Sequence, residues 1–168
     1  IRRRDQVMTV RRTIRIKAFQ ALFQLNNNFQ MTTDQAIKHA LTYSLNKEEE
    51  EIDNLDAIKH ILPVKNVDDQ MAEENLAYLI ELVTGVQENQ KFLDEQLEKR
   101  LKNWSIQRIE ITNLLILRLA AYELYFHEEI DPSIVINVAI EITKSFYNDH
   151  ASKFVNGVLQ GILDAKEV

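Results

Sequence analysis

The stretch Ile111–Phe126, ITNLLILRLAAYELYF, carries the strongest fold signal in the chain. Twelve of its sixteen positions are apolar or aromatic, and it contains neither glycine nor proline. Leucine, isoleucine and alanine dominate, and most of these residues favour a helix. A helix that is apolar on nearly all sides lies inside a bundle rather than on its surface. Burying one leucine or isoleucine contributes about 1.5–3 kcal/mol, so we expect this helix to be the axis of the core.

Two charged residues, Arg118 and Glu123, interrupt this helix. They lie roughly 140° apart around the helix axis, so they do not pair with each other. Each must therefore reach solvent, another segment or a ligand. For Arg118 two interpretations stay open: a buried ion pair with an acid such as Glu141, or contact with RNA.

Composition favours long helices and argues against a membrane protein. The 168 residues suit one domain or two closely packed subdomains, and 45% hydrophobic residues are enough for a core. Three glycines and two prolines predict few tight turns. The absence of cysteine excludes disulfides and thiolate metal sites and fits a reducing cytoplasm. We expect no secretory signal, because the arginine-rich start has no apolar run behind it, and no membrane span, because Arg118 interrupts the apolar run.

Positive charge is concentrated at the start of the chain, although the net charge is −6. Residues 1–17 carry seven basic side chains and one acid, a local charge of +6, which leaves −12 for the remainder. A basic segment on an acidic body suggests that a polyanion binds at one place. We expect residues 1–10 to form a flexible basic arm. If Met8 is the native start of the protein, the arginines at positions 2–4 come from a cloning vector. The alternative is a solvated tail without a ligand.

The first helix is expected over residues 10–26, with one buried apolar stripe. Its members recur at steps of three and four residues: Val10, Ile14, Ala18, Ala21, Leu22 and Leu25. Three arginines and two phenylalanines fall off this stripe: Arg11, Arg12, Arg15, Phe19 and Phe23. Basic residues that lead into an aromatic at helical spacing can hold phosphates and stack a base. The alternative is that both rings belong to the core, which we favour for Phe19 and leave open for Phe23.

Six further helices are predicted, at about 33–46, 69–88, 90–102, 111–126, 132–146 and 152–164. Thr32 and Gln35 have capping-box spacing, and Asp131 before Pro132 signals a helix start. Ser105 is a candidate N-cap for the segment that leads into the central helix. The acidic residues 47–56 are expected to be a solvated loop or helix end rather than a cation site. No sustained alternation predicts a strand, so the expected fold is an all-α bundle.

Signals for enzymatic chemistry are weak. The four histidines, His39, His60, His127 and His150, are scattered, and no HExxH or GxSxG motif occurs. Three glycines cannot supply a phosphate-cradling glycine-rich loop. We therefore expect no catalytic residues, no metal and no cofactor.

Residues 153–159, KFVNGVL, lie at the start of the last predicted helix. Gly157 inside a helix costs about 1 kcal/mol relative to alanine, so we expect another group to approach it closely, as we expect a close helix approach at Gly85. For Asn156 we favour a structural hydrogen bond to a loop or helix end over a contact with a ligand. Phe154 lies off the buried stripe and is a candidate exposed ring.

The order and spacing of four segments resemble the NusB family of bacterial transcription antitermination factors. They are LRLAAYEL at 117–124, Pro132 with Ile136 and Asn137, FVNGVL at 154–159, and RRTIRIKAFQALF at 11–23. The similarity is distinctive over 104–163 and fair over 11–25. Residues 26–68 match in helical character alone, and the acidic stretch looks like an insertion.

This resemblance implies a single NusB-like domain over 1–168 with two helical subdomains. Helices one to three would span about 9–88, and helices four to seven about 90–168. The resemblance also implies that the protein binds boxA RNA of nascent ribosomal transcripts together with the ribosomal protein NusE. This binding would take place within the RNA polymerase antitermination complex and away from membranes.

Family residues transfer to this chain position by position. The implied RNA contacts are Arg11, Arg12, Arg15, Phe23, Arg118 and Phe154. The implied NusE-facing residues are Leu101, Trp104, Arg108 and Asn113.

Two positions depart from the family pattern. The family usually has Asn-Glu-Ala after the proline, whereas this chain has Asn137-Val138-Ala139, which puts a local polar contact in doubt. His150 stands where some relatives carry an acid. Two other functions stay open: a helical protein-interaction scaffold, and an RNA-targeting domain like the NusB-like part of some ribosomal RNA methyltransferases.

Overall fold

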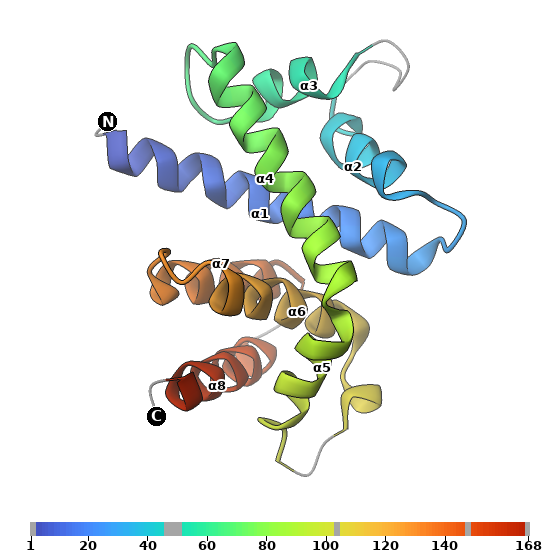
Figure 1. Cartoon of the computed structure of the whole chain (residues 1–168), viewed down its shortest axis with the longest axis vertical. Coiled ribbons are helices and arrows are strands. Elements are labelled where there is room, and N and C mark those ends of the chain that lie inside the picture. Colours follow the sequence, from blue (N-terminus) through green and yellow to red (C-terminus); the bar gives the residue numbers. More distant parts are fainter. Residues whose placement is uncertain (1–2, 46–51, 103–104, 147–148, 167–168) are drawn as a thin grey trace. The chain divides into compact units, whose positions relative to one another are not determined.

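The computed structural model describes residues 3–45, 52–102, 105–146 and 149–166. These residues form eight α-helices and one short 3-10 helix, and no strand occurs among them (Figure 1). The predicted all-α class is confirmed, with one helix more than the seven expected. The chain divides into two compact units, Ile1–Thr84 (unit 1) and Gly85–Val168 (unit 2). The division falls inside the helix predicted at 69–88, rather than after it.

Unit 1 is built by successive helix pairs. Helix α1 (Arg3–Asn27) packs on α2 (Thr33–Thr42), which packs on α3 (Asn54–Ile61). Most of α4 (Asp69–Glu88) also belongs to this unit and crosses α1 in Figure 1. The guanidinium of Arg11 on α1 lies over the ring of Tyr78 on α4. The largest fully buried side chains of the unit are Ile14, Ile37, Leu41, Ile58, Leu79 and Leu82.

Helix α1 differs from its prediction at both its start and its buried face. It begins at Arg3, so residues 3–9, expected to be a flexible arm, are helical. Phe19 is 2% exposed, which confirms it as a core residue. Arg15 was expected off the buried stripe but is 4% exposed. Burial on α1 therefore extends beyond the single stripe seen in the sequence, and besides packing on α2 the helix contacts Tyr78 of α4 through Arg11.

Local capping explains where two helices of unit 1 begin. The predicted capping box of α2 is confirmed, because the Gln35 N–H donates to Thr32 Oγ1 at 3.1 Å and the Thr32 N–H donates to Gln35 Oε1 at 2.9 Å. The α3 helix was missed in the acidic stretch. Its N-cap is Asp53, whose Oδ1 accepts from the Asp56 N–H at 2.8 Å. Residues 46–51 lie outside the described part. Lys59 pairs with Asp69 and so ties α3 to α4.

Unit 2 surrounds α6 (Ile111–Phe126) with α5 (Gln90–Glu98), α7 (Pro132–Phe146) and α8 (Asp149–Lys166). Every residue from 114 to 124 is buried, including Arg118 and Glu123. The sequence prediction of a central helix is therefore confirmed. The helices α5, α7 and α8 pack on it, which is the environment expected for a helix that is apolar on nearly all sides.

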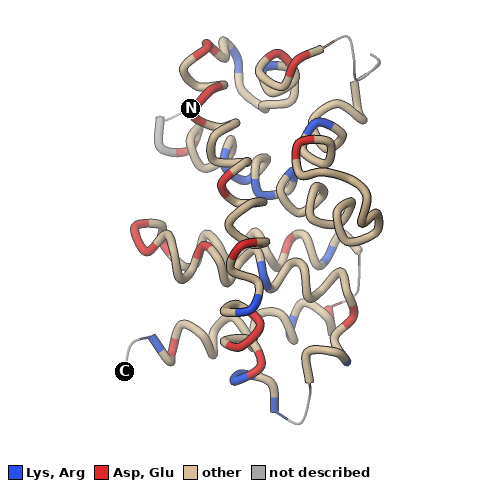
Figure 2. Tube along the Cα trace, turned by 45° about the vertical axis from the view of Figure 1, so that its right-hand side comes forward, with Lys and Arg blue, Asp and Glu red and all other residues tan. Residues whose placement is uncertain are grey.

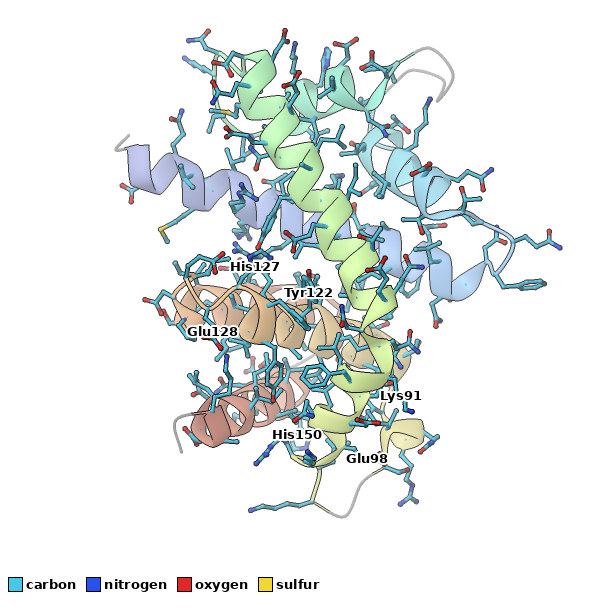
Figure 3. All side chains as sticks on the ribbon, viewed as in Figure 1. Lys91, Glu98, Tyr122, His127, Glu128 and His150 are labelled. Atoms are coloured by element: carbon cyan, nitrogen blue, oxygen red, sulfur yellow. The ribbon has the colours of Figure 1, made fainter. Side chains whose placement is uncertain are left out.

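The two helical glycines singled out in the sequence have opposite environments. A Cβ at Gly85 would lie 2.3 Å from Cζ of Tyr122, so the predicted close helix approach at Gly85 is confirmed. Figure 3 labels Tyr122, which comes from α6 and meets the last turn of α4. A Cβ at Gly157 would meet nothing within 4 Å, so the close approach predicted there is wrong. Gly157 is exposed on α8 and leaves that surface without a side chain.

Several helix ends differ from the sequence prediction. Ser105 precedes a 3-10 helix, η2 (Ile106–Arg108), without a side-chain cap bond, and the N-cap of α6 is Glu110. The α2 and α5 helices end earlier than predicted, at Thr42 and Glu98, while α8 begins at Asp149 instead of 152. None of the helices in the described part combines the length and hydropathy needed to cross a bilayer.

Candidate nucleic-acid interface

A surface cavity of about 750 Å³ in unit 2 gathers aromatic and basic side chains, and we call it the α6–α8 cavity. The η2 helix and the start of α6 form one wall, and the first two turns of α8 form the other. The lining residues are Arg108, Ile109, Glu110, Asn113, His150, Ala151, Lys153 and Phe154. Residues predicted separately for RNA and for NusE thus meet in one place.

The spacing of α8 explains how three of these side chains converge. His150, Lys153 and Phe154 stand at positions i, i+3 and i+4, which share one face of a helix. The N-terminal end of a helix also carries a partial positive charge, which favours phosphate nearby. Lys153 and His150 are exposed, whereas Phe154 is half-buried; His150 is labelled in Figure 3. A ring held in this way offers a face for stacking without becoming part of the core.

The opposite wall adds polar groups. Glu110 is the N-cap of α6, and its Oε2 accepts from the Asn113 N–H at 3.2 Å. Because the carboxylate is used as a cap, its charge is partly offset by the end of the helix. The Oδ1 atom of Asn113 is buried and has no hydrogen-bond partner within the described part of the chain. An amide at this position can read the edge of a base that stacks on Phe154.

In unit 1, the predicted RNA contacts of α1 have unequal exposure. Arg12 is exposed, Arg11 lies over the Tyr78 ring at 4.0 Å from its centroid, and Arg15 is buried. Phe23 is half-buried, with its ring centroid 6.2 Å from that of Phe19. The basic positions of α1 are coloured in Figure 2. Arg12 therefore has the most open position of the three for meeting a phosphate.

Lys17 is a second buried cation of α1. The residue is 8% exposed, and its ammonium lies 4.8 Å from the centroid of the Tyr43 ring. Burial lowers the pKa of Lys17, because desolvation disfavours the charged form. Because Arg15 and Lys17 are buried, the local charge of +6 counted along the sequence overstates the number of cations that are exposed at the surface.

Arg118 is held by an acid of its own unit. Its Nε and Nη2 donate to the two carboxylate oxygens of Asp94 on α5, at 2.7 and 2.9 Å. Arg118 is 8% exposed and does not line the α6–α8 cavity. The expected buried ion pair exists, but its acid is Asp94 and not Glu141, because α5 and not α7 carries an acid within reach of the guanidinium. A role for Arg118 in RNA binding stays a prediction.

The predicted partner-binding residues are only partly brought together. Arg108 and Asn113 line the α6–α8 cavity, Leu101 is half-buried beyond the end of α5, and Trp104 lies outside the described residues.

Lys153 and His150 were not assigned to the site from the sequence. The signal that could have found them is the spacing of three and four residues from His150 to Lys153 and to Phe154, which places the three side chains on one helical face. Among the described residues, no group of three acidic, histidine or cysteine side chains is arranged to hold a metal ion.

Comparisons with known proteins agree with this architecture. The NusB family profile matches residues 12–164. The transcription antitermination protein NusB of Bacillus subtilis (strain 168) is 40% identical over 152 residues, covering 90% of this chain and 93% of that protein. The protein of the same name from Lactiplantibacillus plantarum is 40% identical over 150 residues, covering 89% and 91%.

Solved structures of similar proteins share the fold. T. maritima NusB aligns with a TM-score of 0.67 and 28% identity, covering 90% of this chain and 89% of that one. A structure of the antitermination factors NusB and NusE in complex with dsRNA aligns with a TM-score of 0.67 and 26% identity, covering 93% and 97%. The helical architecture and the match over nearly the whole chain establish that this protein belongs to the NusB family.

Proposed function

We propose that this protein is an RNA-binding transcription antitermination factor of the cytoplasm. It binds the boxA element of nascent ribosomal RNA together with NusE and supports processive elongation by RNA polymerase. The observation that carries the proposal is the α6–α8 cavity, where the Phe154 ring lies beside Arg108 and Lys153. An aromatic face with flanking cations is the arrangement that binds unstacked bases of single-stranded RNA.

The acidic net charge of the chain limits how RNA can bind. With a net charge of −6, the protein cannot attract RNA through diffuse positive charge. Affinity must come from a few localised contacts, for which we assign Arg11, Arg12, Arg15, Phe23, Arg118 and Phe154. The NusE-facing assignment keeps Leu101, Trp104, Arg108 and Asn113, and Arg108 and Asn113 adjoin the RNA site. RNA and NusE would therefore bind next to each other on unit 2.

Titration of boxA RNA and of a scrambled RNA, each with and without NusE, tests the proposal. We expect tighter binding of boxA than of the scrambled sequence, strengthened by NusE. Phe154→Ala should reduce boxA affinity about 5- to 100-fold, because stacking contributes about 1–3 kcal/mol per base, with little change in salt dependence. If neither boxA nor the scrambled RNA binds, even with NusE present, the result would favour a protein-interaction scaffold instead. A large drop in melting temperature for Phe154→Ala would mean that the ring serves the core.

A further inference from the structure

A second cavity lies in unit 1 and, of the residues assigned above to RNA, has only Arg11 in its lining. It has a volume of about 250 Å³ and lies between the first half of α1 and the start of α4, and we call it the α1–α4 cavity. This volume is slightly below the usual range of about 300–1,000 Å³ for small-molecule sites, and it suits one ring rather than a larger ligand. Val10 and Met71 supply apolar walls, and Arg11, Asp68, Glu74 and Asn75 supply polar ones.

Asn75 is the unusual residue of this cavity. It is 5% exposed, and its Nδ2 donates to the Met71 carbonyl oxygen at 2.9 Å. That bond fixes the orientation of the amide, because only the nitrogen can donate to a carbonyl. The Oδ1 atom is buried and accepts no hydrogen bond within the described residues. An unpaired buried acceptor is costly, so its presence beside a cavity indicates a ligand that brings a donor.

The charges around the cavity narrow the chemistry of that ligand. Asp68 and Glu74 disfavour a phosphate, whereas the Arg11 guanidinium, held over the Tyr78 ring, disfavours an ammonium group. Both carboxylates are already hydrogen-bonded, Asp68 to the Met71 N–H and Glu74 to Gln70 Nε2. A neutral ring with N–H donors avoids both repulsions and satisfies Asn75. Carboxylate and amide oxygens are the groups that accept from the amines of bases.

We propose that the α1–α4 cavity binds one unstacked nucleobase that carries an exocyclic amine, which donates to Asn75 Oδ1. This inference rests on the proposed RNA-binding function and adds to it a base-reading contact in unit 1. Arg11 lines the cavity and is held over the Tyr78 ring, so it positions the base instead of contacting only a phosphate. The apolar side chains of Val10 and Met71 exclude water from the faces of the ring.

Nucleosides provide a test that does not depend on boxA recognition. Cytidine, adenosine, guanosine and uridine are added to the full chain, with N-acetyl-lysine amide as a cationic control, and the Asn75 Nδ2 resonances are followed by NMR. We expect saturable shifts with one or more of the three amine-bearing nucleosides and smaller ones with uridine. Shifts with the lysine derivative alone would overturn the proposal in favour of a protein side chain. No shift with any compound would overturn it in favour of a bound water.

The variant Asn75→Leu tests whether the same contact operates in RNA. Each A, C or G of boxA is replaced in turn by uridine. For the wild-type protein we expect that substitution at one position lowers the affinity for the RNA about three- to tenfold, which corresponds to one hydrogen bond. Asn75→Leu should bind the original and that substituted RNA equally, while its melting temperature stays the same or rises. Asn89→Leu is the matched control, because Asn89 Nδ2 makes the same type of bond to the Gly85 carbonyl oxygen at 2.8 Å.

The outcomes separate failure of this inference from failure of the proposed function. If the uridine substitutions change the affinity of the wild-type protein and of Asn75→Leu in the same way, the proposed base site in the α1–α4 cavity is overturned. The proposal that the protein binds boxA is then unaffected. A wild-type protein that binds no boxA RNA would overturn the proposed function, and the nucleoside experiment would still decide whether the cavity takes a base.

Discussion

The two units use their basic residues in different ways. In unit 1, positive charge is dense along α1, yet Arg15 and Lys17 are buried and Arg11 is stacked on Tyr78. In unit 2, basic residues are fewer, but Arg108 and Lys153 are exposed at a cavity that also holds Phe154. Charge density along a sequence therefore does not locate a nucleic-acid surface. Burial decides which cations can reach a phosphate.

The units also differ in how they are held together. Unit 2 has an axis, α6, whose middle turns are buried on every side and whose charge at Arg118 is neutralised by Asp94. The described part of unit 1 is built by successive helix pairs, α1 with α2 and α2 with α3, and its fully buried side chains are spread over α1, α2, α3 and α4. Changes at the centre of unit 2 should therefore have the largest effects on stability.

The largest effect is expected for Asp94→Ala. It leaves the guanidinium of Arg118, 8% exposed, without its carboxylate. Removing one partner of a buried pair destabilises by about 3–5 kcal/mol, and we expect the lower end because the Asp94 side chain is 23% exposed. Urea unfolding measures the change, with Glu95→Ala, an exposed neighbour, as control. A loss below about 1 kcal/mol, typical of surface pairs, would show that α6 does not depend on this contact.

The double variant Arg118→Met with Asp94→Leu separates structure from RNA binding. Replacing a buried pair by apolar residues of similar volume is often neutral or stabilising, so we expect stability much closer to wild type than for Asp94→Ala. If Arg118 serves only the ion pair, boxA affinity should match wild type in a filter-binding assay. A loss of affinity with intact stability would support the predicted contact between Arg118 and RNA.

A smaller effect is expected for Gly85→Ala. The added Cβ would clash with the Tyr122 ring at 2.3 Å, and overpacking of this kind costs about 1–3 kcal/mol. Gly157→Ala is the matched control. Its Cβ would meet nothing within 4 Å, so the better helix former should raise stability by up to about 1 kcal/mol. Thermal melting of both variants checks the pair, and equal destabilisation would contradict the different environments of the two glycines.

The smallest effects concern single phosphate contacts and compare the units directly. Arg12→Ala in unit 1 and Lys153→Ala in unit 2 should each flatten the dependence of log K on log salt by about 0.7, the value for one contact on single-stranded nucleic acid. Lys65→Ala, an exposed lysine outside both regions, is the control. Binding of boxA at a series of salt concentrations measures the slopes. If Lys153→Ala changes the salt slope and Arg12→Ala does not, the RNA strand contacts only unit 2.

Local signals in the sequence were sufficient for much of the fold. Unbroken apolar character predicted α6, and cap residues predicted the starts of α2 and α7. The α3 helix was missed because its cap, Asp53, stands in an acidic stretch that resembles a solvated loop. The burial of Arg15 was missed for a different reason: one stripe is visible in a helical pattern, but the number of neighbours around a helix is not.

The sequence by itself determined an all-α protein with a central apolar helix, a basic first helix and a set of residues that resembles the NusB family. These features depend on propensity, periodicity and caps, which act within a few residues. Only the tertiary structure decided that Arg118 pairs with Asp94 and that Phe154 shares a cavity with Arg108 and Asn113. It also decided that the side-chain oxygen of Asn75, beside the α1–α4 cavity, accepts no hydrogen bond within the described residues. Such contacts join residues that are distant along the chain or depend on how helices pack, and helical periodicity specifies which face a residue occupies but not what lies opposite it.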